Sequence, residues 1–332
     1  MRGPVLLAFL LLAGVARAQE PPGAAGPMAL DGVAGASWTR ALTRVTWPNR
    51  DGHATVVLND KLYVLGGWGT GPLNDVWSSA DAVDWTLVTA EAPWAARKAP
   101  AAVVFHDRIW LLGGSLGVET TNDVWSSPDG AAWTRAVEKA PWHRRHNHAA
   151  VVFDGKIWVL GGWGLKDWND VWSSTDGATW TQATAAAPWS PRNGHTAVVH
   201  GGRIWVMGGW GRKPDGSEGN LNDVWSSADG VAWERATERA PWAPRNHHAA
   251  VEYDGRVWLL GGWGQAGAKE GNLNDVWSSE DGVTWRPATG QAPWLPRNGH
   301  TCVVFQDRMW VIGGWSHFIG GTSVNDLWSS GG

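Results

Sequence analysis

The fold is decided by a stretch that recurs along the chain, and its third copy reads HNHAAVVFDGKIWVLGGWGLKDWNDVWSSTDGATWTQATAAAPW from His146 to Trp189. Four short runs, 148–153, 156–162, 169–174 and 178–184, lack a helical period and are separated by Gly or Asp-Gly, which are turn signals. Asp-Gly between the first two runs predicts a two-residue hairpin. The unit therefore predicts four antiparallel strands, named A to D here in chain order.

Double glycines at the end of strand B mark the period of this repeat. They begin at residues 66, 113, 161, 208, 261 and 313, so the spacings are 47, 48, 47, 53 and 52 residues. Such spacing is typical of propeller blades. The last copy stops at WSSGG without a strand D, whereas an extra strand D and connector, SWTRALTRVTWPNR (37–50), precede the first copy. We predict an all-β fold: a six-bladed β-propeller of four-stranded antiparallel blades, closed by an N-terminal strand that completes the last blade.

The ends of the chain predict export and one large domain. Arg2, an apolar run over 5–15 and the small-x-small triplet 16–18 predict a secretory signal peptide over 1–18, cleaved after Ala18. Residues 19–36 are rich in Pro, Gly and Ala and predict a flexible lead-in, followed by the propeller over 37–330. No later stretch is long and apolar enough to cross a membrane. We expect a secreted or periplasmic monomer.

Composition narrows the classes of partner and chemistry. A net charge of -4 with 17% charged residues gives no reason to expect nucleic acid or an anionic membrane as a partner. The single cysteine, Cys302, excludes an internal disulfide. The chain holds 29 Trp against 2 Tyr and 5 Phe. We expect the indoles of strands B, C and D to form the core, and those of the connectors and after the double glycines to be available for function.

The unit resembles the Kelch repeat over residues 37–330. The resemblance rests on the double glycine that ends strand B, the Arg-x-x-His before strand A, the Asn-Asp of strand C and the Trp of strand D. Strand C departs from it, because Ser stands where Kelch repeats usually have Tyr: Ser79, Ser127, Ser174, Ser227 and Ser279. The following SxDGxxW resembles an Asp-box shortened by one residue. The resemblance implies the fold and leaves the function open.

Three sets of side chains gather on one face of such a propeller, where the B–C loops and the D–A connectors lie. The arginines that precede strand A are Arg50, Arg97, Arg145, Arg192, Arg245 and Arg297. The histidines that begin strand A are His53, His148, His195, His248 and His300. The indoles after the double glycine are Trp68, Trp163, Trp210, Trp263 and Trp315. The second unit differs, with Pro100 for His, Ser115 for Trp, and Lys98 beside Arg97.

These sets predict a binding surface. An indole face covers the apolar C–H groups of a sugar while polar neighbours bind its hydroxyls, and loops on a rigid scaffold concentrate binding residues. We expect an exported, non-enzymatic binding module for a glycan or small polar ligand, without a cofactor. A protein-interaction scaffold is an alternative. For the arginines a structural role is the competing interpretation, because guanidinium can stack on a connector indole and brace adjacent blades.

An enzyme is a further alternative. The chain is similar to N-acetylneuraminate epimerases in size, blade count and compartment, and this implies a sugar epimerase or mutarotase that uses an acid/base pair and a carboxylate anchor. By that resemblance Glu119 would act as base and Arg97 or Lys98 as anchor, with Glu252 as a second irregular acid. Galactose oxidase or sialidase chemistry is not expected, because Tyr63 and Tyr253 occupy ordinary repeat positions.

A metal site is the weakest of the alternatives. The segment HRRHNH contributes His143, His146 and His148, and His247 stands at a related position in a later unit. Imidazole ligands must converge at about 2.0 to 2.1 Å from a metal ion, whereas histidines on successive blades are spread around a ring. We therefore expect no metal, and name HRRHNH as the place where one would be found.

Overall fold

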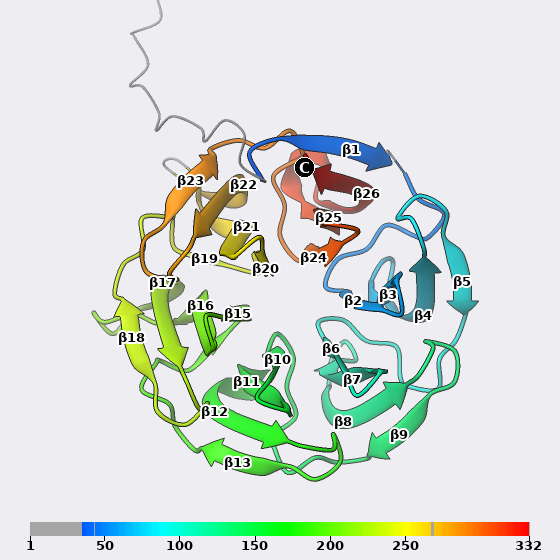
Figure 1. The fold of residues 1–332 in the computed structure, drawn as a ribbon, viewed down its shortest axis with the longest axis horizontal. Helices are drawn as coiled ribbons and strands as arrows, with labels where there is room; N and C mark the ends of the chain where they lie inside the picture. Colours follow the sequence, from blue (N-terminus) through cyan, green and yellow to red (C-terminus); the bar gives the residue numbers. More distant parts are fainter. Residues whose placement is uncertain (1–34, 43, 267–268, 332) are drawn as a thin grey trace, which may run out of the picture.

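The computed structural model describes residues 35–42, 44–266 and 269–331 and shows six blades around a central axis (Figure 1). The predicted signal peptide and nearly all of the lead-in lie outside these residues. Within them, the regular elements are strands apart from one 3-10 turn, η1 (His317–Ile319). The prediction of an all-β, six-bladed propeller is confirmed.

Each blade is a four-stranded antiparallel sheet whose strand A lines the axis and whose strand D lies at the rim (Figure 1). The first blade consists of β2 (Ala54–Leu58), β3 (Lys61–Trp68), β4 (Pro72–Ser79) and β5 (Thr86–Thr89). The second consists of β6 (Ala101–Phe105), β7 (Arg108–Ser115), β8 (Thr120–Ser127) and β9 (Thr134–Val137). The third consists of β10 (Ala149–Phe153), β11 (Lys156–Gly164), β12 (Lys166–Ser174) and β13 (Thr181–Thr184).

The later blades have the same plan with longer B–C hairpins. The fourth consists of β15 (Thr196–His200), β16 (Arg203–Arg212), β17 (Glu218–Ser227) and β18 (Glu234–Thr237). The fifth consists of β20 (Ala249–Tyr253), β21 (Arg256–Ala266), β22 (Lys269–Ser279) and β23 (Arg286–Thr289). The sixth consists of β24 (Thr301–Phe305), β25 (Arg308–Ser316), β26 (Thr322–Ser330) and β1 (Trp38–Leu42). Two short strands, β14 (Arg192–Asn193) and β19 (Arg245–Asn246), join the third, fourth and fifth blades.

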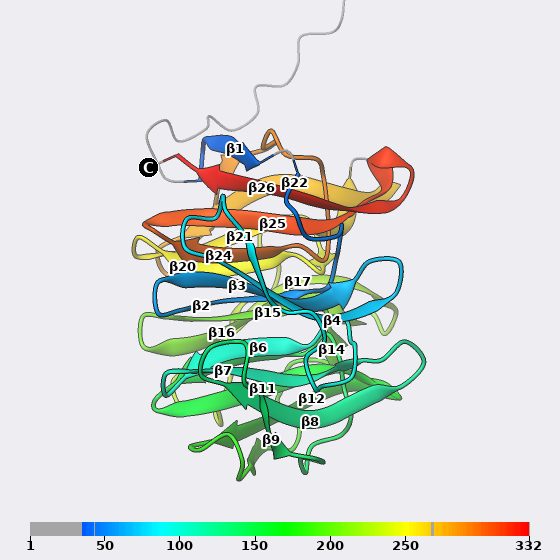
Figure 2. The same cartoon turned by 90° about the vertical axis from the view of Figure 1, so that its right-hand side faces the viewer.

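The ring closes as predicted, because β1 pairs with β26 and so supplies strand D of the sixth blade. Trp38 lies opposite Ser330 in this pairing, and its indole packs edge-on against Trp294 with ring centroids 6.3 Å apart. The N-terminal strand therefore completes a sheet whose other three strands come from the end of the chain. Seen edge-on, the B–C loops of β3–β4, β7–β8 and β25–β26 project to the same side (Figure 2).

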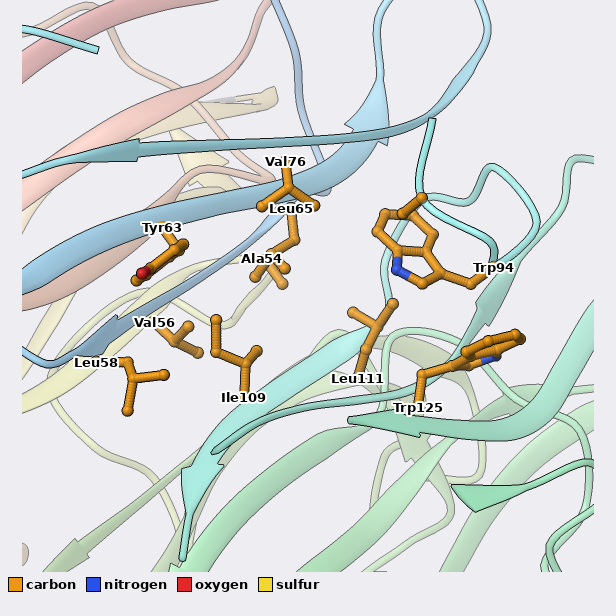
Figure 3. Packing of buried hydrophobic residues seen from close by; sticks show 11 residues of the cluster. Ala54, Val56, Leu58, Tyr63, Leu65, Val76, Trp94, Ile109, Leu111 and Trp125 are labelled. Atoms are coloured by element: carbon orange, nitrogen blue, oxygen red, sulfur yellow. The ribbon is translucent and has the colours of Figure 1, made fainter. Parts of the chain in front are cut away.

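The core lies between the blades, and Figure 3 shows the part between the first and second. Leu65 and Val76 of the first blade pack against Ile109 and Leu111 of the second, and all four are fully buried. The alternation of strand A places every second residue of β2 inside, whereas β3 is buried along nearly its whole length. Burial of these aliphatic side chains stabilises each junction by about 25 cal/mol per Å² of apolar surface.

The connector indoles belong to this core. Each is only 1% exposed and makes an edge-to-face contact with the strand D indole of the next blade, at 5.8 to 6.3 Å between centroids. The pairs are Trp47–Trp85, Trp94–Trp133, Trp142–Trp180, Trp189–Trp233, Trp242–Trp285 and Trp294–Trp38. Our expectation that the connector indoles are available for function is wrong, because they form part of the packing between blades.

The double glycine has a conformational reason. In the third blade Gly161 and Gly162 have φ of 52° and 101°, and the register of β11 against β12 shifts there by a bulge. A Cβ on Gly162 would lie 2.5 Å from the Cβ of His148 and 2.9 Å from its Cα. Glycine is therefore required at this position both by the backbone and by the neighbouring strand A.

The Asp-box-like turn between strands C and D is also built from local bonds. Asp176 Oδ1 accepts hydrogen bonds from the backbone N–H groups of Ala178 and Thr179 at 2.8 and 2.7 Å and from the Ser174 hydroxyl at 3.0 Å. The backbone donor of Thr179 is the main cause that lowers the pKa of Asp176 to about 2. The Ser that replaces the usual Kelch Tyr is thus part of this turn.

Around the axis, six residues form a closed circle of backbone hydrogen bonds, here called the axial circle. Each N–H donates to the carbonyl of the equivalent residue in the preceding blade, over N···O distances of 2.6 to 3.2 Å. All six residues have φ between 48° and 60°. They are Gly52, Ala99, Asn147, Gly194, His247 and Gly299. The ring is thus closed at the axis by the bond between Gly52 and Gly299 as well as at the rim by the pairing of β1 with β26.

Candidate ligand-binding face

The six predicted arginines are structural. Each is 0% exposed, and its guanidinium makes two hydrogen bonds to the strand C aspartate of its own blade and one to the first carbonyl of the double glycine. In the second blade, Arg97 reaches Asp123 at 2.7 and 2.9 Å, while its backbone N–H donates to Leu73 of the first blade. Such bidentate pairs are strong and geometrically specific. Our prediction that these arginines contact a ligand is wrong, because they link adjacent blades in the interior.

The five predicted histidines lie between the blades at one end of the central channel. All five are 4 to 6% exposed. Four of them, His53, His195, His248 and His300, line a cavity of about 230 Å³ together with Pro100 and the first residues of the A strands. Burial and the neighbouring arginine lower the pKa of His53, His195 and His300 to about 3. These imidazoles are therefore neutral at ordinary pH, and they stand inward of the surface where a ligand was predicted.

The post-glycine indoles differ from every other set. Trp163 is 41% exposed and the other four are partly exposed, in contrast to the 1% of the connector indoles. The ring centroids of Trp263 and Trp315 lie 6.3 Å apart, and the ring centroid of His317 in η1 lies 5.8 Å from that of Trp263. In the second blade Ser115 is buried. The set is therefore a surface feature of five blades that is interrupted at one.

Beside these indoles stand the residues that follow the six arginines, here called the axial positions. They are Asp51, Lys98, His146, Asn193, Asn246 and Asn298. Each pairs through its backbone with the post-glycine residue of its own blade, as in Asp51 with Trp68 and Lys98 with Ser115. The sequence analysis named two of these positions, Lys98 as a contact of the small ligand and His146 as a residue of the metal alternative. The available signal was that this position varies in charge although the arginine before it never changes.

Side chains at several axial positions reach the B–C loop of the preceding blade. Asp51 Oδ2 accepts a hydrogen bond from Ser323 at 2.7 Å, and Asn193 donates to Asp167 at 2.7 Å. The Lys98 ammonium instead lies 5.4 Å from the ring centroid of Trp68, a cation–π distance. The axial positions thus place polar side chains beside the indoles, although Asn246 is buried, and the permanent cation among the six is Lys98 of the second blade.

One cavity on this face combines the two kinds of residue. It has a volume of about 460 Å³ and lies where the first, second and sixth blades meet. Its walls include Trp68, Trp315, Asp51, Lys98 and Asn298. Burial raises the pKa of Asp51, against the opposing effects of the Ser323 hydroxyl and the Lys98 charge. Two indoles, a carboxyl group, an amide and an ammonium are thus within reach of one small ligand.

The candidate catalytic residues are not brought together. Glu119 is exposed and lies with His143 and Arg144 on a separate cavity of about 590 Å³, whereas Arg97 is held inside the second blade by Asp123. Glu252 is exposed on β20, 3.8 Å from His200. The resemblance-based pairing of Glu119 with Arg97 is therefore wrong. Lys98 alone of that group stands on the surface formed by the axial positions and the post-glycine indoles, here called the axial face.

The structure does not bring the three histidines of the metal alternative together: among the residues it describes there is no group of three or more His, Cys, Asp or Glu side chains placed to hold an ion. His143 stacks on Trp168 with centroids 4.0 Å apart, His146 lies 5.3 Å from Trp163, and His148 packs against Trp142 at 6.1 Å. Each of the three rings thus contacts a different indole.

Comparison with known proteins places this geometry in a family. Residues 31–209 match the family described as the KLHDC2/KLHL20/DRC7 Kelch-repeats domain, and residues 296–329 match the Kelch motif. The chain belongs to the Kelch-repeat family. This Kelch propeller has the same overall fold as a solved chain described as "Structure of YjhT", with a TM-score of 0.69 over 86% of this chain and 95% of that one. At 18% identity that similarity concerns the fold alone.

Curated relatives match only parts of the Kelch propeller. The Leucine-zipper-like transcriptional regulator 1 homolog of Drosophila melanogaster is 29% identical over 124 residues, which are 35% of this chain and 12% of that protein. The Ras guanine nucleotide exchange factor F of Dictyostelium discoideum is 30% identical over 100 residues, 28% of this chain and 8% of that protein. The chain thus spans about a tenth of each. The part of this chain that the structure describes has no helix with the length and hydropathy of a membrane span.

Proposed function

We propose that this Kelch propeller is an exported, non-enzymatic binding module that holds a glycan or other small polar ligand on its axial face. The observation that carries the proposal is the difference between two sets of indoles: connector indoles are 1% exposed, whereas post-glycine indoles are accessible beside the axial positions. Packing accounts for the first set and not for the second. Export rests on the predicted signal peptide.

The cavity between Trp68 and Trp315 supports a sugar-sized ligand. Its volume of about 460 Å³ is in the range of small-molecule sites. Indole faces contact the C–H groups of a sugar ring, while Asp51 accepts and Asn298 donates and accepts hydrogen bonds from hydroxyl groups. Lys98 gives this side of the ring its charge. A single ligand here would be oriented by the second blade, where the repeat is irregular.

Replacing Trp68 by Ser tests this site, since Ser is what the second blade itself carries at the equivalent position. We expect Trp68→Ser to weaken binding of a saccharide by about tenfold or more, because one wall of the cavity is lost. A glycan array would identify a saccharide that binds, and isothermal titration calorimetry would give its affinity.

The matched control is Trp210→Ser, the same change in the fourth blade, outside the lining of this cavity. It should change the affinity by less than about twofold. Failure of the unchanged protein to bind any of a broad panel of saccharides would contradict the proposal.

A protein-interaction scaffold is the second candidate, and Kelch domains generally mediate protein interactions. The observation in its favour is a pair of exposed aliphatic side chains, Val118 and Leu165, on the B–C loops of neighbouring blades, next to Trp163. Affinity capture of a protein partner that is lost in Val118→Ser/Leu165→Ser would support it. The epimerase alternative has no observation of comparable weight. It would be excluded if NMR showed that the protein does not accelerate the exchange between the anomers of sialic acid.

A further inference from the structure

A second cavity lies on the fourth blade, and none of the axial positions lines it. Its volume of about 720 Å³ exceeds that of the cavity between Trp68 and Trp315. It is bounded by the hairpin between β16 and β17, by β18 and the residues after it, and by the connectors before the fourth and fifth blades. Proline rings form much of its apolar wall: Pro188, Pro191, Pro214 and Pro244.

Cations outnumber acids around this cavity, although the chain as a whole carries a net charge of -4. The basic residues that line it are Arg212, Lys213, Arg235 and Arg239. The acidic residues are Asp215, Asp223 and Glu238. The local excess of positive charge is therefore opposite in sign to the average surface and requires its own explanation.

Two of the three acids, Asp223 and Asp215, already accept hydrogen bonds from the protein itself. Both oxygens of Asp223 accept hydrogen bonds from the buried Arg192 at 2.7 Å, so its charge is compensated from inside the blade. Asp215 Oδ1 accepts from the backbone N–H and the hydroxyl of Ser217 at 2.9 and 2.6 Å, which closes the tip of the hairpin. Glu238 has only a loose, exposed contact with Arg235 at 3.9 Å.

The cations lack comparable partners. Arg212 donates through Nε to the carbonyl of Gly216 at 3.2 Å, which leaves its terminal nitrogens without a carboxylate. Within the described residues neither Lys213 nor Arg239 has a carboxylate within 4.0 Å. Three cations therefore face one cavity without a carboxylate at ion-pair distance.

The second blade offers an internal comparison. Arg135, Glu138 and Lys139 occupy the positions of Arg235, Glu238 and Arg239, and Arg135 lies 5.7 Å from the Trp125 centroid just as Arg235 lies 5.8 Å from Trp225. The B–C loop of the second blade, 115–120, is shorter and carries no cation. The pair of cations on its B–C hairpin, Arg212 and Lys213, thus distinguishes the fourth blade from the second.

We propose that this cavity is a second binding site of the Kelch propeller and that it takes an acidic, extended peptide segment of a partner protein. Guanidinium and ammonium groups recognise carboxylates, and proline rings pack against the aliphatic parts of a peptide. A saccharide suits the site less, because the Trp225 indole is covered by Arg235 and its Nε1 already donates to Asp223. The inference is independent of a ligand on the axial face.

The experiment uses the whole chain and a fluorescein-labelled peptide of alternating Glu and Pro, with binding followed by fluorescence anisotropy. Arg212→Ser/Lys213→Ser should raise the dissociation constant about tenfold. Arg135→Ser/Lys139→Ser removes the same number of charges from the second blade and should change it by less than about twofold. A peptide with Lys in place of Glu should not bind.

Two results would overturn the proposal. Equal weakening by both double variants would show attraction to dispersed surface charge, and a sulfated heparin oligosaccharide that binds more tightly than the peptide would exclude a peptide as the preferred ligand. The four substituted side chains, Arg212, Lys213, Arg135 and Lys139, are exposed or partly exposed. The midpoint of thermal unfolding should therefore be the same in both double variants as in the unchanged protein, and measuring it shows whether a variant has lost its fold. Trp68→Ser should leave peptide binding intact, which separates this test from that of the axial face.

Discussion

At the scale of single residues, repetition and function are easily confused. Arginine is present in all six units and exposed in none, whereas the post-glycine indole is missing from one unit and is accessible in the other five. The partner of the arginine, the aspartate of strand C, is equally repeated: Asp75, Asp123, Asp170, Asp223, Asp275 and Asp326. A cation and an anion that recur together indicate an internal ion pair, and this pattern could have been read from the sequence.

The buried ion pair of the third blade makes the first prediction at this scale. Arg145→Ala leaves Asp170, which is also buried, without its counter-charge, so we expect the free energy of unfolding to fall by about 3 to 5 kcal/mol. Arg203→Ala removes an exposed pair with Glu234 and should cost about 1 kcal/mol or less. Denaturation in urea measures both, and equal losses would contradict a structural role for Arg145.

Much of the candidate site could not be predicted, for a physical reason. The period of a repeat tells which residues are equivalent, but it does not give their depth in the molecule. The connector Trp and the post-glycine Trp both lie toward the face of the B–C loops, yet only the first inserts between blades, where it meets the strand D indole of the next unit. That contact joins residues of different elements, so it cannot be inferred from the spacing of the tryptophans along the sequence.

At the scale of the element, the blade was predictable almost in full. Asp-Gly turns, the double glycine and alternating apolar residues each act within one unit, so the four strands follow from local chemistry. The strand B bulge at Gly161 and the hydrogen bonds of the Asp176 turn confirm why those residues recur. The B–C loops differ in length, and their cavities could not be foreseen from the repeat.

The bulge supports a second prediction. Gly162→Ala places a Cβ 2.5 Å from His148 at a φ of 101°, so we expect a loss of about 3 kcal/mol or more. Gly155→Ala also has a positive φ, 65°, but its Cβ would meet nothing within 4 Å, and the cost should be about 1 kcal/mol. Similar losses on chemical unfolding would mean that backbone strain alone selects glycine in strand B.

At the scale of the whole molecule, the histidines around the channel predict acid lability. His53, His195 and His300 have a pKa of about 3 in the folded protein, against 6.5 for an exposed imidazole, so the unfolded chain binds more protons below pH 6.5. Their contribution to stability is complete above pH 6.5 and is lost as the pH falls toward 3. Each should remove about 1.4 kcal/mol per pH unit in that interval.

Chemical unfolding between pH 7 and pH 4.5 would measure this slope. In His300→Gln the free energy of unfolding should fall less steeply with decreasing pH, by up to about 1.4 kcal/mol per pH unit, which corresponds to one proton. The reason is that an amide does not titrate in this range. A slope unaffected by that change would show that other groups cause the acid sensitivity. The cause lies in the assembled ring, since burial between blades and the nearby arginines depress these pKa values.

The axial circle has a consequence for the order of events during synthesis. Its bonds run through Gly52 of the first blade and Gly299 of the sixth, so it cannot be complete until the chain has been synthesised as far as the sixth blade. The axial circle therefore forms only after the first five blades have been synthesised, however early the single blades form. A ligand held there would bind only finished molecules, and would protect them against the parting of first and last blades.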